Sequence, residues 1–410
     1  MFSAGVCRVA APCGIPHVPP GPHRREPPKE NVVQRTSPAC AGRRTGAFAA
    51  AIAAAAVLLL PACDSAGPER DGGQPSVPPA AADIGCAGNG KLLASGSTAQ
   101  QNALEYWVEE YERACPGVQI SYRPLGSGAG VAQFLRGATV FGGTDSALKP
   151  GEVELSKEVC PGGRAIDLPM VGGPIAIGYQ LEGVDDLVLD APAIAGIFDA
   201  RITTWDHPDI RRLNPGTELP SVPVLPVHRS DESGTTQNLN AYLSGAVPRQ
   251  WPYPKEKAWQ GRGGQSADGS DGVAAAVLAS NGAIGYFELS FAEAGHIDTV
   301  RIDTGASEPV GPSAENATAG LAAAEVTGTG NDMTMRFDYG TSEAGAYPIV
   351  LVTYEVVCDT GNQKQTLPAL KSLLAYMAGE EGQRALPELH YAPLPGNVVE
   401  QVREVIATLS

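Results

Sequence analysis

The chain has 410 residues, with 29 Lys and Arg against 45 Asp and Glu, and therefore a formal net charge of −16. This length is far above what a chain needs to bury a core, and it allows two domains of ordinary size. The acidic balance argues against non-specific nucleic-acid binding, which needs clustered basic residues. Hydrophobic residues, at 43%, argue against wholesale disorder. We expect a mainly globular protein without a nucleic-acid partner.

The first 62 residues have the features of a signal peptide. They hold seven basic and two acidic residues, a net charge of +5, which leaves −21 for the remaining 348 residues. Arg43 and Arg44 precede an uncharged apolar run at residues 47–60, which is short for a membrane span of about 20 residues. Because the preceding stretch is Pro-rich and patternless, we expect translation to start near Val32 or Val33.

The apolar run ends in Leu-Pro-Ala-Cys at residues 60–63, which resembles the bacterial lipobox. The resemblance implies cleavage before Cys63 and its modification by a lipid, such as palmitate, as the first residue of the mature protein. Residues 63–82 are rich in Pro, Gly, Ser and Ala and predict a flexible tether. We therefore expect a lipoprotein that is anchored to the outer face of the cell membrane and works in water.

Four cysteines lie in the body of the chain, and none has the Cys-x-x-Cys spacing of a zinc site. Residues 91–95 predict a buried strand, and residues 99–114 predict a helix with one apolar face. Because a helix that follows a strand returns antiparallel to it, Cys86 before the strand and Cys115 after the helix should lie near the same sheet edge. We predict a Cys86–Cys115 disulfide and, by elimination, a Cys160–Cys358 disulfide.

Strands and helices alternate along the rest of the body. Hydrophobic periodicity predicts strands at residues 118–122, 139–142, 169–179, 222–227, 283–287 and 349–357, with a bend at residues 172–174. It predicts helices at residues 131–135, 236–243, 271–280, 370–378 and 398–409. Repeated strand–loop–helix units favour an α/β protein with largely parallel sheets.

Three loops with small hydroxyl residues and glycines stand where a predicted helix begins, at residues 95–98, 126–130 and 229–235. Unpaired backbone N–H groups and the positive end of the helix dipole make such a position suited to an anion. A single loop of this kind is more often an ordinary helix cap. Three in one chain, one of them with an arginine, predict an anion site.

Arg229 supplies a positive charge with the fork geometry that suits an oxyanion, and Asp231 can hold it in place. Asp145 can serve an anion site because a carboxylate only accepts hydrogen bonds. It can pair with an oxyanion that still carries a proton, such as hydrogen phosphate. A fully ionised anion such as sulfate would place two acceptors against each other, at a cost of several kcal/mol.

These loops, together with Phe-Gly-Gly-Thr-Asp at 141–145, Tyr-Pro-Ile at 347–349 and Tyr-Ala-Pro-Leu-Pro at 391–395, resemble the phosphate-binding proteins of bacterial phosphate ABC transporters (PstS type). The segments 203–205, 213–216 and 271–274 also fit. The resemblance implies a type II periplasmic-binding-protein fold, in which mixed sheets are flanked by helices and two crossover strands form a hinge. It places one lobe at residues 83–171 plus 347–410 and the other at residues 172–346.

The resemblance also implies a ligand set of hydroxyl groups, backbone N–H groups, one carboxylate and one guanidinium. Carried over by position, the phosphate contacts are Thr98, Ala99, Ser127, Gly128, Asp145, Arg229, Ser233, Gly234 and Thr235. We expect Asp231 to support Arg229, and we expect no catalytic residue, cofactor or metal. Some members of the family carry an aromatic residue at the place of Ala99 and a serine at the place of Gly128.

The resemblance therefore implies a monomeric extracytoplasmic receptor that captures phosphate and delivers it to a membrane permease. Two alternatives are a receptor for another tetrahedral anion, such as arsenate, and a secreted phosphatase on the same scaffold. The second would need a metal cluster or an activated nucleophile, and the sequence offers no such motif. A glycine-rich segment at residues 85–91 is not a nucleotide P-loop, because it lacks the final Ser or Thr and precedes a strand.

Overall fold

The structure is a computed structural model that describes residues 84–410. The predicted export signal, the lipidation site at Cys63 and the linker at residues 63–82 lie outside the described residues. Within residues 84–410 no helix combines the length and the hydrophobicity needed to cross a membrane.

The first part of the described chain alternates strands with helices. Its elements are β1 (Gly90–Gly96), α1 (Gln101–Ala114), β2 (Val118–Pro124), α2 (Ser127–Leu135), β3 (Phe141–Thr144), α3 (Pro150–Ser156) and β4 (Ala165–Gln180). The segment 85–89 leads directly into β1, as expected for a loop that is not a P-loop.

The middle part contains mostly shorter elements. They are β5 (Val188–Asp190), α4 (Ala191–Phe198), α5 (Pro208–Leu213), β6 (Leu225–Arg229), α6 (Gly234–Ala246), β7 (Gln265–Ala267), α7 (Gly269–Leu278), β8 (Ala283–Glu288), α8 (Leu289–Gly295), β9 (Asp298–Thr299), β10 (Arg301–Asp303), α9 (Ala314–Leu321), β11 (Glu325–Val326) and β12 (Met335–Arg336). The last part consists of β13 (Val350–Cys358), α10 (Leu367–Met377), α11 (Glu380–Arg384), the 3-10 helix η1 (Leu386–Leu389) and α12 (Gly396–Thr408).

One mixed sheet runs through the described residues in the order β2-β1-β3-β13-β4-β8-β6-β7, with β9 also paired to β4. The strands at each end are parallel, whereas β13 is antiparallel to both β3 and β4. The sheet is therefore less parallel than the strand–helix alternation predicts. The reason is that β4 and β13 carry the chain along the sheet in opposite directions.

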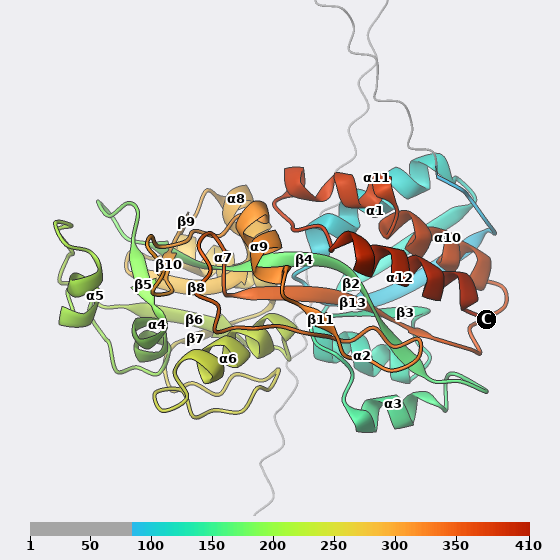
Figure 1. The fold of residues 1–410 in the computed structure, drawn as a ribbon, viewed down its shortest axis with the longest axis horizontal. Coiled ribbons are helices and arrows are strands. Elements are labelled where there is room, and N and C mark those ends of the chain that lie inside the picture. The colour runs from blue at the N-terminus through green and yellow to red at the C-terminus, as the bar shows by residue number, and fades with distance from the viewer. Residues whose placement is uncertain (1–83) are drawn as a thin grey trace, which may run out of the picture. The chain divides into compact units, whose positions relative to one another are not determined.

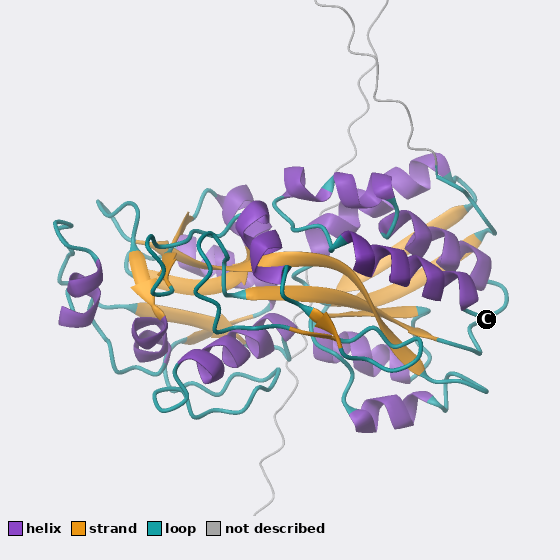
Figure 2. Ribbon diagram, in the orientation of Figure 1, coloured by secondary structure: helices purple, strands orange, loops and turns teal. Residues whose placement is uncertain are grey.

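The fold is a two-lobed α/β arrangement joined by these long strands (Figure 1). Residues 165–174 of β4 pair with β13, and residues 175–180 of the same strand pair with β8. Helices α1–α3 and α10–α12 gather around the sheet at the β1 end, and α4–α9 gather at the β6 end (Figures 1 and 2). We call these the first and the second lobe. The exact lobe boundaries given above remain predictions.

Every strand and helix predicted from periodicity within residues 84–410 is present, with shifted ends. The largest shifts are at the starts of β4, at Ala165 instead of residue 169, and of α2, at Ser127 instead of residue 131. The glycine-rich loop therefore forms the first turn of α2. Strand β4 runs without interruption through the expected bend at residues 172–174, and it changes its pairing partner there. Both predicted disulfides, Cys86–Cys115 and Cys160–Cys358, are confirmed.

Helix α1 packs its apolar face into the core and thereby fixes the first of the three loops. Leu104, Trp107 and Tyr111 are buried on this face. The Trp107 indole donates to the carbonyl of Gly382 at 2.9 Å, and the Tyr111 hydroxyl donates to Ser372 Oγ at 2.8 Å. These bonds tie α1 to the C-terminal helices, because an aromatic side chain that buries its ring still needs a partner for its polar atom.

The two disulfides should differ in their effect on stability. Cys160 and Cys358 are 198 residues apart, whereas Cys86 and Cys115 are 29 residues apart. In the chain-entropy description, the disulfide that closes the longer loop removes more conformational entropy from the unfolded chain. It should therefore add about 2 kcal/mol more to the free energy of unfolding. We expect the Cys160→Ala/Cys358→Ala variant to lose more free energy of unfolding in urea than the Cys86→Ala/Cys115→Ala variant. Equal losses would contradict this expectation.

Candidate functional site

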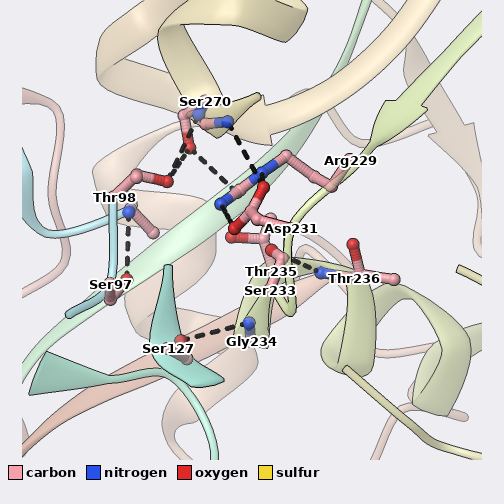
Figure 3. Close-up of polar contacts among 12 residues, drawn as sticks. Ser97, Thr98, Ser127, Arg229, Asp231, Ser233, Gly234, Thr235, Thr236 and Ser270 are labelled. Atoms are coloured by element: carbon pink, nitrogen blue, oxygen red, sulfur yellow. Dashed lines mark hydrogen bonds and ion pairs between the residues drawn. The ribbon is translucent and has the colours of Figure 1, made fainter. Parts of the chain in front are cut away.

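Four junctions between a strand or loop and a helix meet at one place between the two lobes (Figure 3). The first lobe contributes the loop before α1 and the start of α2, and the second lobe contributes the starts of α6 and α7. Ser127 stands at the first position of α2, and Ser233 caps α6 by accepting from the Thr236 N–H at 3.2 Å. Several helix N-termini, each a source of unpaired N–H groups and positive potential, therefore contribute to a common site.

The Ser127 hydroxyl connects the two lobes. Its oxygen accepts from the backbone N–H of Gly234 at 3.1 Å and from that of Asp145 at 3.2 Å, and the hydroxyl donates to Asp145 Oδ2 at 3.3 Å. The Thr235 hydroxyl also donates to Asp145 Oδ2, at 3.4 Å. Four of the predicted ligand residues, Ser127, Asp145, Gly234 and Thr235, are thus in direct contact.

Asp145 is a buried carboxylate, with 2% of its surface exposed. Its Oδ1 atom is buried and has no hydrogen-bond partner among residues 84–410. Burial raises the pKa of Asp145, and the Ser97 hydroxyl, the Arg229 charge, the Ser127 hydroxyl and the Lys257 charge each lower it in part. This oxygen is therefore an acceptor that a protonated ligand oxygen can satisfy.

Arg229 ends β6 and is fully buried, with 1% of its side chain exposed. Its guanidinium makes a bidentate pair with Asp231: Nε donates to Oδ1 at 2.7 Å, and Nη2 donates to Oδ2. The predicted supporting role of Asp231 has the geometry that it needs. Because this pair fixes the plane of the guanidinium, the remaining Nη1 is aimed by the protein before a ligand arrives.

Thr98 faces Ser270, the second residue of α7 (Figure 3). The Thr98 hydroxyl oxygen accepts from the Ser270 N–H at 3.2 Å and lies 2.8 Å from Ser270 Oγ. Arg229 Nη1 donates to the same Ser270 hydroxyl at 3.4 Å. Ser270 was not among the predicted residues, although the rule that found the other loops, a hydroxyl residue beside a glycine at a helix start, also describes residues 269–270.

Two predicted backbone donors bond within the protein in this structure. The Ala99 N–H donates to Ser97 Oγ at 3.0 Å. The Gly128 N–H donates across the lobes to the carbonyl of Glu232 at 2.9 Å. Ser97 and Glu232 lie in two of the predicted loops but were not in the predicted ligand set, because a residue that bonds to a neighbouring main-chain group leaves no distinctive mark in the sequence.

The lobes approach too closely here for any side chain at two glycines. A Cβ atom at Gly128 would lie 2.5 Å from Glu232 Cβ, and one at Gly126 would lie 2.1 Å from Asp231 Oδ2. Gly126 also has a φ of +87°, which L side chains rarely adopt. The glycines that make the 126–130 loop an anion-site motif therefore also allow the two lobes to meet.

The site has the parts to hold one small oxyanion: hydroxyl donors, helix N-termini, one buried guanidinium and one carboxylate acceptor. The Ser127 hydroxyl bonds to Asp145 and Gly234, not to a histidine that could activate it as a nucleophile. In the part of the chain that the structure describes, no group of three or more His, Cys, Asp and Glu residues could hold a metal ion.

Comparisons with known proteins give a consistent result. Residues 76–381 match the model of the PBP superfamily domain. The chain is 41% identical to phosphate-binding protein PstS 3 of Mycobacterium leprae over 321 residues, which cover 77% of this chain and 86% of that protein. It is 38% identical to phosphate-binding protein PstS 2 of Mycobacterium tuberculosis over 372 residues, which cover 90% and 99%.

Among solved structures, a phosphate-binding protein from Stenotrophomonas maltophilia matches with a TM-score of 0.61 at 18% identity, over 77% of this chain and 93% of that one. At this identity the likeness shows the fold alone, and it agrees with the two-lobed arrangement described above. The sequence matches go further, because they extend over most of both chains. The chain belongs to the PBP superfamily and, within it, to the PstS phosphate-binding proteins.

Proposed function

We propose that this protein captures inorganic phosphate in the site between its lobes and hands it to the permease of a phosphate ABC transporter. Its relatives bear the name of phosphate-binding proteins, and two of them are at least 38% identical over most of this chain. Like them it is a binding protein and not an enzyme. The lobes close on the ligand by hinging at β4 and β13, and no bond is made or broken.

The observation that carries this proposal is the buried Asp145 carboxylate beside a fixed guanidinium. A site for any anion would need only donors, whereas this site also holds an acceptor whose Oδ1 atom has no partner within residues 84–410. Such an acceptor favours a ligand that carries both negative charge and a proton. Hydrogen phosphate meets both requirements, and sulfate does not.

The proposal includes the ligand set Thr98, Ala99, Ser127, Gly128, Asp145, Arg229, Ser233, Gly234 and Thr235. In this proposal the donors that pair within the protein, such as the Gly128 N–H, exchange these partners for a bound oxyanion. The proposal also includes a monomer, a lipid anchor at Cys63, a location outside the cytoplasm, and lobes divided near residues 171 and 346. Support for the lobe boundaries is that β4 exchanges β13 for β8 as its partner after Pro174.

Isothermal titration calorimetry of the purified full chain tests the proposal. We expect phosphate to bind at least about 100-fold more tightly than sulfate, because opposing two buried acceptors costs about 3 kcal/mol or more. Arsenate shares the geometry and the proton of phosphate and should compete with it. Equal affinity for phosphate and sulfate would contradict the proposed selectivity, and phosphate release from a chromogenic ester would favour the enzyme alternative.

Replacement of the acceptor should relax the selectivity. Asp145→Asn keeps the size of the side chain but provides an N–H donor in place of a carboxylate oxygen. We expect the preference for phosphate over sulfate to fall by roughly ten- to hundred-fold, because sulfate no longer meets an unpaired acceptor. Competition calorimetry with both anions measures this ratio. The control is Asp185→Asn, which makes the same change at an exposed aspartate of the second lobe and should leave the ratio unchanged.

A methyl group at Gly128 should prevent full closure. In Gly128→Ala the new Cβ would lie 2.5 Å from Glu232 Cβ, a contact that only movement of the 229–235 loop can relieve. Because overpacking of this kind costs about 1–3 kcal/mol, we expect phosphate affinity to fall roughly ten-fold or more. Gly151→Ala is the matched control, since a Cβ there meets nothing within 4 Å. Unchanged affinity in Gly128→Ala would show that closure does not bring these residues together.

A further inference from the structure

A buried lysine that the sequence motifs do not include lies beside the candidate site. Lys257 is in the segment between α6 and β7, and only 6% of its surface is exposed. Its Nζ atom is buried and has no hydrogen-bond partner among the described residues 84–410. A buried ammonium group is costly unless opposite charges compensate it, so its position calls for a physical reason.

The main chain around Lys257 is fixed to the ligand loop and to the other lobe. Its carbonyl accepts from the N–H of Ser233, the cap of α6, at 3.1 Å. The preceding residue, Glu256, forms an ion pair with Lys149 of the first lobe at 2.6 Å. Lys149 follows Asp145 by four residues, so this segment of the second lobe is in contact with the loop that carries Asp145.

Acceptors without partners stand in that loop and next to it. Asp145 Oδ1, Ser146 Oγ and Asp167 Oδ1 are all buried, and none has a hydrogen-bond partner within residues 84–410. Asp167 belongs to the same neighbourhood, because its Oδ2 accepts from the Leu148 N–H at 3.0 Å. Lys257, a cationic donor without a partner, thus belongs to a segment that contacts the loop of these acceptors.

The effects of Lys257 on the pKa values of Asp145 and Asp167 agree with this placement. Burial, followed by the charge of Asp332, raises the pKa of Asp167 to about 7, and the positive charge of Lys257 acts in the opposite direction. The charge of Lys257 also lowers the pKa of Asp145, against the larger effect of burial. The charge of Lys257 thus favours the ionised form of both carboxyl groups.

The other groups that face Asp145 do not provide a free positive charge. The charge of Arg229 also lowers the pKa of Asp145, but its guanidinium is held in a bidentate pair with Asp231. Burial, and to a lesser extent the charge of Asp145, holds the pKa of Glu355 on β13 well above its usual value, against a hydrogen bond to Gln100 that lowers it, and Glu355 adds no positive charge. Burial likewise keeps Tyr122 on β2 neutral by raising its pKa. Of the two residues whose positive charge lowers the pKa of Asp145, Lys257 is the one whose cationic group has no hydrogen-bond partner within residues 84–410.

We propose that Lys257 is a positioning residue of the anion site, which supplies from the second lobe the countercharge for Asp145 in the first. Its function is to keep Asp145 an acceptor once closure has removed the carboxylate from water. An ionised Asp145 accepts a hydrogen bond from hydrogen phosphate and repels sulfate, whereas a protonated Asp145 can donate to either anion. The lysine therefore contributes to selectivity through Asp145 and need not contact the ligand. This inference rests on the proposed function.

The test compares three variants of the full chain by calorimetry with phosphate and with sulfate, between about pH 5 and pH 8. Without the charge, Asp145 takes up its proton at a higher pH, because one of the effects that lower its pKa is gone. In Lys257→Met we expect sulfate binding to appear at a pH at least about one unit higher than in the unaltered protein. Lys257→Arg keeps the charge and should stay close to the unaltered protein. Lys364→Met removes the same charge at an exposed position between β13 and α10 and should change neither anion's affinity.

The outcomes separate this inference from the proposed function. If the unaltered protein fails to bind phosphate, both the proposed function and the proposed role of Lys257 are overturned. If it binds phosphate and rejects sulfate, and Lys257→Met does the same over the whole pH range, only the role of Lys257 is overturned. The same conclusion follows if Lys257→Arg loses selectivity as Lys257→Met does, because the charge is then not the cause. Thermal unfolding of each variant without ligand checks that the fold is kept, which we expect because a Met side chain can replace a buried charge without loss of packing.

Discussion

The burial of the Asp145 carboxylate is the constraint around which the site is organised. A carboxylate that leaves water needs donors and compensating charge, or it takes up a proton. Here Ser127 and Thr235 donate to its Oδ2 atom, from the first and the second lobe respectively. Arg229 and Lys257 lower its pKa from the second lobe. Part of what keeps this buried carboxylate ionised therefore comes from the opposite lobe, and the ionisation of Asp145 is linked to the contact between the lobes.

The sheet makes this dependence possible. Because β4 pairs first with β13 and then with β8, a single strand belongs to both lobes, and movement of the lobes must occur near its midpoint. A hydrogen-bonded chain lies close to that midpoint: Ser290 Oγ donates to the Tyr391 hydroxyl at 3.1 Å, and this hydroxyl donates to the Ala99 carbonyl at 2.6 Å. These two hydrogen bonds connect the end of β8 to the loop that holds Thr98. The hinge and the ligand loop are thus mechanically connected by residues that do not face the anion.

Much of this fold could be predicted from the sequence because local residue patterns determine it. Strands β1 and β8 and helix α1 follow from periodicity, and the Cys86–Cys115 disulfide follows from the antiparallel return of a helix along its strand. Helix α4 could not be predicted in this way. Seven of its eight residues are buried and none of the eight is polar, so it has no polar face and no helical period to detect.

The parts of the site that sequence missed share a physical cause. Ser270 contacts Thr98 only because the two lobes meet, since 172 residues separate them in the sequence. Lys257 likewise lies in a different lobe from Asp145. The pairing of Arg229 with Asp231 could be predicted because the two residues are only two positions apart. A lysine whose partners belong to another lobe resembles any surface lysine, and the neighbouring Lys255 is one. Motifs therefore identify residues whose partners are close in the sequence better than they identify residues whose partners belong to another lobe.

The net charge of the chain illustrates the difference between the surface and this site. A charge of −16 for the whole chain opposes the approach of an anion only weakly, because salt screens charges beyond about 8 Å at physiological ionic strength. Inside the closed site the distances are those of hydrogen bonds, and screening by solvent is small. There the balance is set by a few groups: one neutral Arg229–Asp231 pair, helix N-termini, and Asp145 opposed by Lys257. An acidic protein can select an anion because selectivity arises where water is excluded, and the charges of the surface do not determine it.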